Sequence, residues 1–206
     1  MKTYYYGLLI LTSLITISFT SCEKENSKNN NQVLIPLKQG NKWTYESHRG
    51  TNTGSAVIEI GENVNINGHK GYKFLSGIRA HNATFLVDND ADGNFVIVGG
   101  YSDLDTLISP SINYKLNAKK NDSWNCENIE IINDNGIFKK NPLIIYCINT
   151  DTTITTVKGN FKCMMYKYSP NSGADVFINY FSVNFGIIKS EHYENNKLNS
   201  FMTLTD

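Results

Sequence analysis

The sequence predicts a mainly β, antiparallel single domain with little helix, built as a sandwich, a barrel or a half-barrel. From Val33 onward the apolar residues recur with a period of two, which is typical of half-buried strands, and not with the 3.6-residue period of a helix. Phe181, Val183 and Phe185, for example, share one parity. Turn dipeptides such as Asn67-Gly68 separate the alternating runs, as they do in antiparallel hairpins.

The expected strands follow from this alternation in chain order. An opening strand carries Trp43 and Tyr45, and a second run alternates from Ile58 to Ile66. Further runs lie at 83–87, 95–98, 161–168, 177–185 and 198–204. The 4 prolines fall at the edges of runs, where a missing backbone N–H is tolerated.

The composition excludes several classes of protein. Lys plus Arg (19) balance Asp plus Glu (19) in the 206 residues and no basic block stands out, so binding to nucleic acid is not expected. A hydrophobic content of 40% argues against a disordered chain. Only one stretch, at the N-terminus, is apolar enough to enter a membrane, which argues against a protein with several spans.

Residues 1–21 are typical of a lipoprotein signal peptide. Lys2 supplies a short positive region, and the apolar run of about a dozen residues that follows is too short for a membrane-spanning helix. Two small residues then precede Cys22, which resembles the lipobox of bacterial lipoproteins, where the signal is cut before a Cys that carries acyl chains such as palmitate. Lipidation of Cys22 is therefore expected. The alternative is an ordinary secretory signal cut near Ser21.

Residues 22–32 are expected to form the lipidated Cys and a flexible tether, followed by a single β-domain at 33–206. The ten residues after Cys22 include no apolar residue, so they have nothing to bury. Their start, Glu23-Lys24-Glu25, resembles short export signals of Gram-negative lipoproteins, and no Asp follows Cys22 directly. We therefore expect a protein held in the outer membrane by a lipid anchor, on either its periplasmic or its surface face.

Three segments resemble a family of bacterial outer-membrane or secreted lipoproteins of poorly known function. They are LIPLKQGNKWTYES (34–47), TTITTVKGNFKCMMYKY (152–168) and YFSVNFGIIKSEHYENNKLNSFMTL (180–204). They are similar to the family's PLxxGNxWxY opening strand, its GxFxC hairpin and its GlvK motif before the final strands. The resemblance implies a fold and a location, and it brings no catalytic residue with it.

One acidic motif is a candidate calcium site. Asp88, Asp90 and Asp92 occupy alternate positions and are followed by a glycine, which matches the first half of a calcium-binding loop. At position twelve, however, Gly99 stands where a bidentate Glu is needed. The other interpretation is a polar β-turn that joins two strands. Apart from this candidate Ca²⁺, no cofactor is expected.

Three cysteines lie beyond Cys22, and an odd number leaves at least one of them unpaired within the chain. A two-residue hairpin loop at 135–136 would place Cys126 opposite Ile145 and diagonal to Cys147 on the same face. This geometry makes a Cys126–Cys147 disulfide the first candidate. The alternative is that no disulfide forms. Cys163 is expected to be a buried thiol, because small cysteines pack well in a core.

No motif for catalysis occurs in the sequence. The histidines are far apart, and neither a GxSxG turn nor a glycine-rich phosphate loop occurs, so no catalytic residue is expected. Aromatic residues of the strands are candidates for a sugar-stacking surface or for core and cross-strand pairs. They are Tyr72, Phe74, Tyr101, Tyr166, Tyr168, Tyr180 and Tyr193.

Two functions therefore stay open. The first is a non-enzymatic binding or accessory module whose partner is a glycan, a peptide or another envelope protein. The second is a hydrolase that acts on envelope or environmental polymers. A hydrolase needs a concave site with converging polar groups, whereas a binding module needs only a suitable groove or patch.

Overall fold

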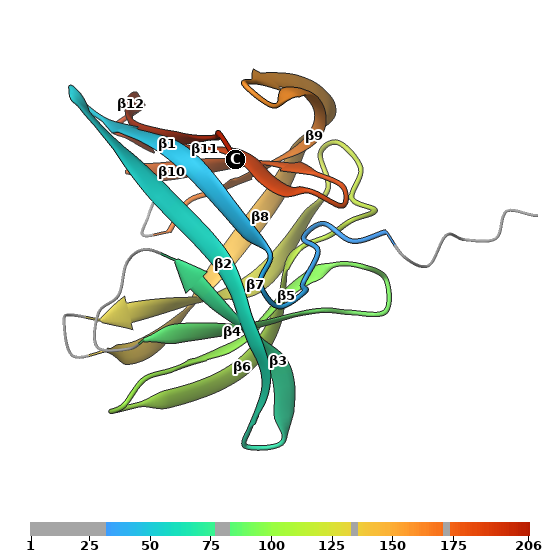
Figure 1. Ribbon diagram of the computed structural model, residues 1–206, viewed down its shortest axis with the longest axis vertical. Coiled ribbons are helices and arrows are strands. Elements are labelled where there is room, and N and C mark those ends of the chain that lie inside the picture. Colours follow the sequence, from blue (N-terminus) through green and yellow to red (C-terminus); the bar gives the residue numbers. More distant parts are fainter. Residues whose placement is uncertain (1–31, 77–82, 133–135, 171–173) are drawn as a thin grey trace, which may run out of the picture.

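A computed structural model describes residues 32–76, 83–132, 136–170 and 174–206 (Figure 1). These residues form twelve strands and no helix, and every pair of neighbouring strands is antiparallel. The prediction of a mainly β, antiparallel fold is confirmed. No helix that could cross a membrane occurs in this part of the chain. The predicted signal peptide (1–21) and the predicted lipidation site, Cys22, lie outside the described residues.

The strands follow one another with short connections. They are β1 (Lys42–Arg49), β2 (Asn52–Ile66), β3 (His69–Ser76), β4 (Thr84–Asn89), β5 (Phe95–Tyr101), β6 (Thr106–Tyr114), β7 (Ser123–Ile132), β8 (Ile137–Thr156), β9 (Gly159–Tyr168), β10 (Asp175–Ser182), β11 (Gly186–Glu194) and β12 (Lys197–Leu204). Asn67 and Gly68 have positive φ in the β2–β3 turn, as an Asn-Gly hairpin turn requires.

All twelve strands belong to one sheet, in the order β6-β5-β4-β3-β2-β1-β12-β11-β10-β9-β8-β7. Each strand pairs with the next one in sequence except β6, which does not pair with β7, and at the centre the first strand pairs with the last through Tyr45 and Leu204. β6 and β7, which are consecutive in the chain, form the two edges. The sheet rolls up so that these edges meet, and the result is a nearly closed barrel (Figure 1).

Side chains join the two edges of the rolled sheet. The indole N–H of Trp124 on β7 donates a hydrogen bond to the carbonyl oxygen of Ile112 on β6 (3.1 Å). The backbone N–H of Glu127 donates to the hydroxyl of Ser111 across the same gap (2.8 Å). These bonds engage backbone groups at an edge that would otherwise offer them to another strand.

The main core lies inside the rolled sheet and is rich in aromatic rings. Tyr114 is in contact with Phe181 and Tyr166, with ring centroids 4.4 and 5.2 Å apart. The hydroxyl of Tyr166 donates to the carbonyl oxygen of Lys115 (2.7 Å), so this fully buried ring leaves no polar group unsatisfied. Such packing supplies the apolar burial that stabilises the domain.

The first described residues enter this core. Leu34 and Ile35 are both almost completely buried there. Val33 and Asn184 exchange two hydrogen bonds, from the Val33 N–H to the Asn184 side chain (3.0 Å) and from the Asn184 N–H to the Val33 carbonyl (2.7 Å). The segment is therefore clamped against the β10–β11 turn before β1 begins.

The β4–β5 turn holds the same segment from the other side. The N–H of Leu34 donates to the carbonyl oxygen of Gly93 (3.3 Å). Gly93 has a φ of +77°, and a Cβ on it would overlap the carbonyl oxygen of Gln32. Only glycine meets both demands without strain, because it tolerates positive φ and carries no side chain.

Candidate binding site

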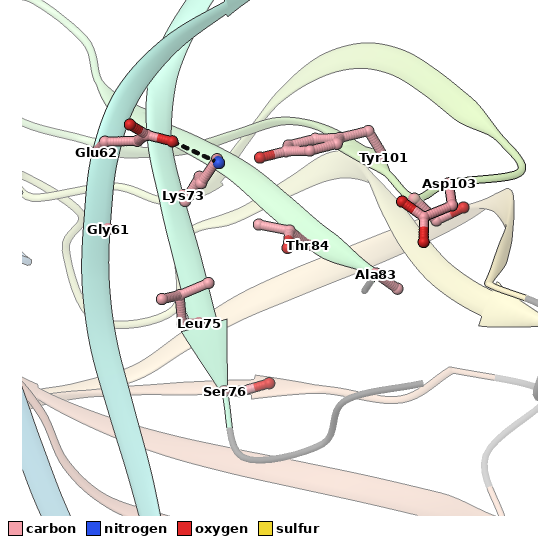
Figure 2. A pocket seen from close by; sticks show the side chains of 10 residues that line it. Gly61, Glu62, Lys73, Leu75, Ser76, Ala83, Thr84, Tyr101 and Asp103 are labelled. Atoms are coloured by element: carbon pink, nitrogen blue, oxygen red, sulfur yellow. Dashed lines mark hydrogen bonds and ion pairs between the residues drawn. The ribbon is translucent and has the colours of Figure 1, made fainter. Parts of the chain in front are cut away.

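A polar groove of about 540 Å³ lies between β2, β3, β4 and the start of the β5–β6 loop (Figure 2). Lys73 and Glu62 face each other in it with 2.6 Å between ammonium and carboxylate, and this hydrogen bond raises the pKa of Lys73. Lys73 also lies over the ring of Tyr101, 5.9 Å from its centroid. Thr84 and Asp103 each have an interaction partner as well. Lys73, Glu62, Thr84 and Asp103 already have partners, whereas the hydroxyl of Tyr101 is buried here without a hydrogen-bond partner among the described residues, so the groove offers few free polar groups to a ligand.

The candidate calcium residues form a turn in which their carboxylates do not converge. The carboxylate of Asp90 accepts hydrogen bonds from the backbone N–H groups of Asp92 and Asn94, each at 2.9 Å, and from the Asn94 side-chain amide at 2.8 Å. The carboxylate of Asp88 accepts the N–H of Asn89 instead (2.9 Å). The described residues hold no cluster of three or more metal-binding side chains. The backbone N–H of Gly93 donates to the carbonyl oxygen of Asp90 (3.0 Å), as in a β-turn, and calcium binding stays a prediction.

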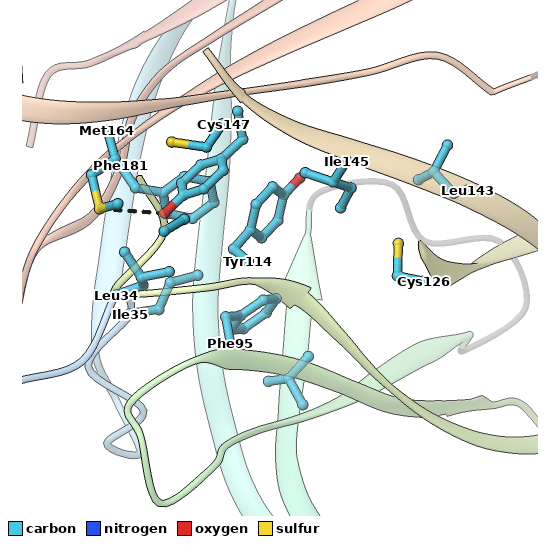
Figure 3. Close-up of a cluster of buried hydrophobic side chains, with 13 residues drawn as sticks. Leu34, Ile35, Phe95, Tyr114, Cys126, Leu143, Ile145, Cys147, Met164 and Phe181 are labelled. Carbon is cyan, nitrogen blue, oxygen red and sulfur yellow. Dashed lines mark hydrogen bonds between the residues drawn. The ribbon is translucent and has the colours of Figure 1, made fainter. Parts of the chain in front are cut away.

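The three cysteines beyond Cys22 are buried free thiols. Cys126 and Cys147 lie at separate places in the core (Figure 3). The sequence-based register was wrong by two residues, because Cys126 pairs with Leu143 and not with Ile145. The strands close at Ile132 and Ile137, so the connection is longer than two residues. Cys147 then lies four residues along from the partner of Cys126, about 13 Å at the rise of a strand, which is too far for a disulfide.

Most of the predicted aromatic residues are engaged in the fold and not in a sugar platform. Tyr166 is completely buried, and Tyr72 and Phe74 pack against the main core. Tyr180 and Tyr193 both donate hydrogen bonds to the carboxylate of Glu191. There are two exceptions. Tyr101 lines the polar groove, and Tyr168 belongs to a row of rings that reaches a second groove.

This second groove, the His192 groove, has a volume of about 550 Å³ and lies across β2, β1, β12, β11 and β10. Its lining residues are Ser47, His48, Arg49, Asn52, Thr53, Gly54, Phe177, Ser190, His192, Ser200, Phe201 and Met202. The surface that they expose in the groove is mostly apolar, and a few polar groups lie among it. Such a mixture is typical of ligand sites.

A row of directly opposed residues forms the floor of this groove. Across the five strands from β1 to β9, Arg49 pairs with Ser200, Ser200 with His192, His192 with Phe177, and Phe177 with Tyr168. Directly opposed residues of antiparallel strands project from the same face of the sheet. Tyr168 packs against the main core, so the groove lies on the inner face, at one end of the rolled sheet.

The rings in this row stack in parallel. Tyr168 and Phe177 have centroids 5.1 Å apart and planes 10° from parallel, and Phe177 and His192 are 4.4 Å apart at 4°. The stack ends at His192, because its neighbour in the row is Ser200 and not another ring. The outer face of the imidazole is therefore open to the groove.

Small residues make the hollow beside His192. In the next row of opposed residues Ser190, Ser47 and Gly54 are small and Met202 is the one long side chain, and Ser200 lies within the first row. Strand positions occupied by serine or glycine leave space above the sheet that longer side chains would fill. The hollow therefore results directly from the register.

The polar groups around the hollow differ in how firmly they are held. His192 is fixed by Asp175, whose carboxylate lies 2.9 Å from Nε2, and by the Asn199 amide, 3.5 Å from Nδ1. Arg49, at the other end of the row, is exposed. Among the described residues no carboxylate lies within 4 Å of its guanidinium. The groove thus offers one ring face and one unpartnered cation.

A buried charge lies on the opposite face of the same strands. Glu191 is only 7% exposed, and its carboxylate lies 2.6 Å from the ammonium of Lys189. Burial alone would raise the pKa of Glu191, but the hydrogen bonds from Lys189, Tyr180 and Tyr193 outweigh it and lower the pKa. Its partners are complete, so Glu191 is a structural element of the fold.

The sequence pointed to Tyr168 as a candidate but missed Phe177, His192 and Arg49 as members of one site. The alternation within 175–185 identified Phe177 as a strand residue and nothing more. These side chains come from three strands, and only the pairing of those strands brings them together. The serines of the hollow, Ser47, Ser190 and Ser200, are far apart in the chain, so they form no local signal either.

No protein-family model and no curated protein match the chain. Among solved structures it is similar to a candidate lipoprotein from Parabacteroides distasonis, with 14% identity and a TM-score of 0.40 over 84% of this chain and 97% of that one. A candidate exported protein with a YmcC-like fold from Bacteroides fragilis has 14% identity and a TM-score of 0.41, over 82% and 96%.

The hypothetical lipoprotein YmcC from Escherichia coli is also similar, with 11% identity and a TM-score of 0.30 over 79% of this chain and 83% of that one. At such identities and TM-scores neither the fold nor the function of the chain follows from these likenesses. The family resemblance of the three sequence motifs stays a prediction.

Proposed function

We propose that the protein is a non-enzymatic binding module of the bacterial envelope, held in the outer membrane by acyl chains on Cys22, and that its ligand is an acidic glycan bound in the His192 groove. The observation that carries the proposal is the pairing of an open ring face on His192 with the unpartnered guanidinium of Arg49. The anchor is supported by the sequence around Cys22.

The chemistry of the groove suits a sugar that carries a carboxylate. The apolar face of a pyranose ring packs on an aromatic ring, and the outer face of His192 is available for this contact. Arg49 binds carboxylates through two parallel N–H donors, which favours a uronic acid over a neutral sugar. The hydroxyls of Ser47, Ser190 and Ser200 are donors and acceptors of the kind that sugar hydroxyls pair with.

A glycan fits this groove better than a peptide does. Peptides commonly bind to sheets by adding a strand to an unpaired edge. The strands beneath the groove, β2, β1, β12, β11 and β10, are all paired on both sides, and the edges are β6 and β7. Recognition must therefore come from side chains alone, which suits a ligand with rings and hydroxyls.

The groove also supports binding over hydrolysis. Glycoside hydrolases generally use two carboxyl groups that flank the scissile bond. The described lining of the His192 groove includes no Asp or Glu. Asp175 contacts His192 from outside that lining.

The test is calorimetric titration with an acidic polysaccharide. Methyl esterification of its carboxylates removes the charge and leaves the sugar rings unchanged. We expect the mature chain with Cys22→Ser, which cannot be acylated, to bind polygalacturonate and not its fully methyl-esterified form. Arg49→Gln should weaken binding about tenfold, because a charge-assisted hydrogen bond is lost. Lys197→Gln removes an exposed cation from the first residue of β12 and is the matched control. Equal binding of both polymers, no binding of either, or equal effects of the two substitutions would contradict the proposal.

A further inference from the structure

An exposed apolar patch lies at the end of the barrel where the described chain begins. Phe185 is 52% exposed and contacts Phe161 edge to face, with ring centroids 5.2 Å apart. Trp43 lines a groove of about 630 Å³ together with these two rings. Val157, in the neighbouring β8–β9 turn, is 81% exposed. These four residues are called the Phe185 patch, and exposed apolar surface of this kind marks an interaction site.

Lysines surround the patch. Lys42, Lys158 and Lys162 line the same groove as Phe161 and Phe185. Lys158 pairs with Asp206 (2.5 Å) and Lys162 with Asp151 (2.8 Å), so two of the three charges are balanced. The long apolar stems of lysines allow them to lie along an apolar surface while the ammonium groups stay in the polar layer above it. Aromatic rings with lysines around them are typical of a membrane–water interface.

The patch adjoins the point from which the anchor must extend. Asn184, the residue before Phe185, holds Val33 by two hydrogen bonds. Pro36 and Phe185 line a smaller groove together with Trp43. The ten residues from 23 to 32 separate Cys22 from this point, and ten extended residues span at most about 35 Å. An acylated Cys22 would therefore keep the patch within a short distance of the bilayer surface.

We infer that the Phe185 patch docks on the surface of the bilayer that carries the anchor. The inference rests on the proposed lipidation of Cys22, because the anchor makes a weak contact sufficient. A tether of this length raises the effective concentration of the bilayer to the millimolar range, so even a contact of low affinity is occupied. Phe185 and Val157 then enter the interface, and the ammonium group of Lys42, the one of the three lysines that forms no ion pair within the described residues, meets a headgroup phosphate.

This docking would set the direction of the His192 groove. The groove lies at the end of β1 marked by Arg49, whereas the Phe185 patch lies at the other end, marked by Lys42. Figure 1 shows the β1–β2 hairpin and the first described residues at opposite sides of the molecule. A patch that contacts the bilayer therefore points the groove away from it.

The test measures the affinity of the patch without the acyl chains. The mature chain with Cys22→Ser is mixed with vesicles of phosphatidylethanolamine and phosphatidylglycerol, and the bound fraction is measured by flotation. We expect weak binding that Phe185→Ser reduces about tenfold, since a large apolar side chain is lost from the interface. Leu198→Ser is the matched control, because Leu198 is 50% exposed at the opposite end of the barrel. Both changes are at exposed positions, so unchanged melting temperatures should verify the folds.

Three results would overturn the inference. They are no binding by the Cys22→Ser chain, equal binding by Phe185→Ser and its parent, and equal losses from Phe185→Ser and Leu198→Ser. A vesicle-independent dimer that Phe185→Ser dissociates would identify a second copy as the occupant instead. None of these results bears on acylation, which is measured separately by fatty-acid labelling of the wild-type protein.

Discussion

Phe177 and His192 lie ring to ring across the β10–β11 ladder, with centroids 4.4 Å apart and planes 4° from parallel. Because Asp175 and Asn199 hold the two imidazole nitrogens, the ring of His192 is fixed before any ligand arrives. A fixed ring loses little conformational entropy on binding, which favours affinity. The stack is therefore the part of the groove most directly suited to recognition.

Filling the hollow beside this stack should block the groove. Ser200 is the neighbour of His192 in the row, and Ser200→Leu would occupy the space in front of the open ring face. We expect binding of polygalacturonate to fall below detection in calorimetry while the melting temperature changes little. Thr203→Leu adds similar bulk to the same strand on the other face of the sheet and should leave binding unchanged. Retained affinity in Ser200→Leu would place the ligand elsewhere.

The buried carboxylate of Glu191 should make stability depend on acid pH. Its pKa is lowered in the folded state, so its stabilising effect is complete above the ordinary Glu value of about 4.3 and is lost as the pH falls through the lower folded pKa. We expect Glu191→Gln to destabilise the protein by about 2 kcal/mol at pH 7 and to flatten the decline of stability below pH ~4.3.

Denaturant unfolding over a pH series measures both effects. Glu62→Gln is the control, because Glu62 forms a surface ion pair with Lys73 and should contribute less than about 1 kcal/mol. A parallel decline of stability with acid in wild type and Glu191→Gln would refute the assignment.

The three buried thiols should resist alkylation in the native protein. Burial raises the pKa of both Cys126 and Cys163 to about 11, and it also raises the pKa of Cys147, so almost no thiolate exists at pH 8. We expect no mass increase after iodoacetamide treatment of the folded Cys22→Ser chain. Unfolding without a reducing agent should expose all three to labelling. A chain that takes up only one label after unfolding would contain a disulfide.

The glycine that faces the first described residues should be hard to replace. Gly93→Ala combines the cost of positive φ, about 1–2 kcal/mol, with overlap against Gln32. Gly68→Ala is the matched control, since Gly68 also has positive φ (+87°) but a Cβ added to it would have no neighbour within 4 Å. We expect the extra loss at Gly93 to be about 1–3 kcal/mol in urea unfolding. Equal losses would mean that the segment at 32–35 does not depend on this turn.

Substitution of Cys22 should abolish membrane attachment without unfolding the domain. We expect Cys22→Ala to abolish labelling by a fatty-acid probe and to release the protein from washed membranes, because a weak surface contact alone does not survive dilution. The domain should stay folded, with an unchanged far-UV spectrum. Wild-type protein without the label, or Cys22→Ala that still sediments with washed outer membranes, would disprove the lipid anchor.

The alternation of apolar residues was enough to predict strands, because a side-chain period of two is a local property. Strand order was not predictable in this way. Tyr45 and Leu204 pair at the centre of the sheet although they come from the first and last strands. The register of β7 against β8 was also wrong, since it depended on the length of one loop, and a shift of two residues moved Cys126 away from Cys147.

The candidate site was even less visible from the sequence. Arg49, His192 and Phe177 belong to strands that meet only through the β1–β12 pairing and the two ladders beside it. Their residue types are ordinary for strands when taken one at a time. They form a site because the residues next to them have small side chains, which leaves a hollow above the sheet. A single sequence does not show which strands will lie next to each other, so it does not reveal such a hollow.

The clamp on Val33 and Leu34 also has a mechanical consequence. A protein pulled by an anchor at Cys22 would receive the force at this segment, eight residues or more before β1 begins at Lys42. The load would be divided between Asn184 on one turn and Gly93 on another, with two buried side chains behind them. A pulling force would thus act on the buried side chains of the core. The hydrogen bonds of β1 would not bear this force directly and would not break one after another.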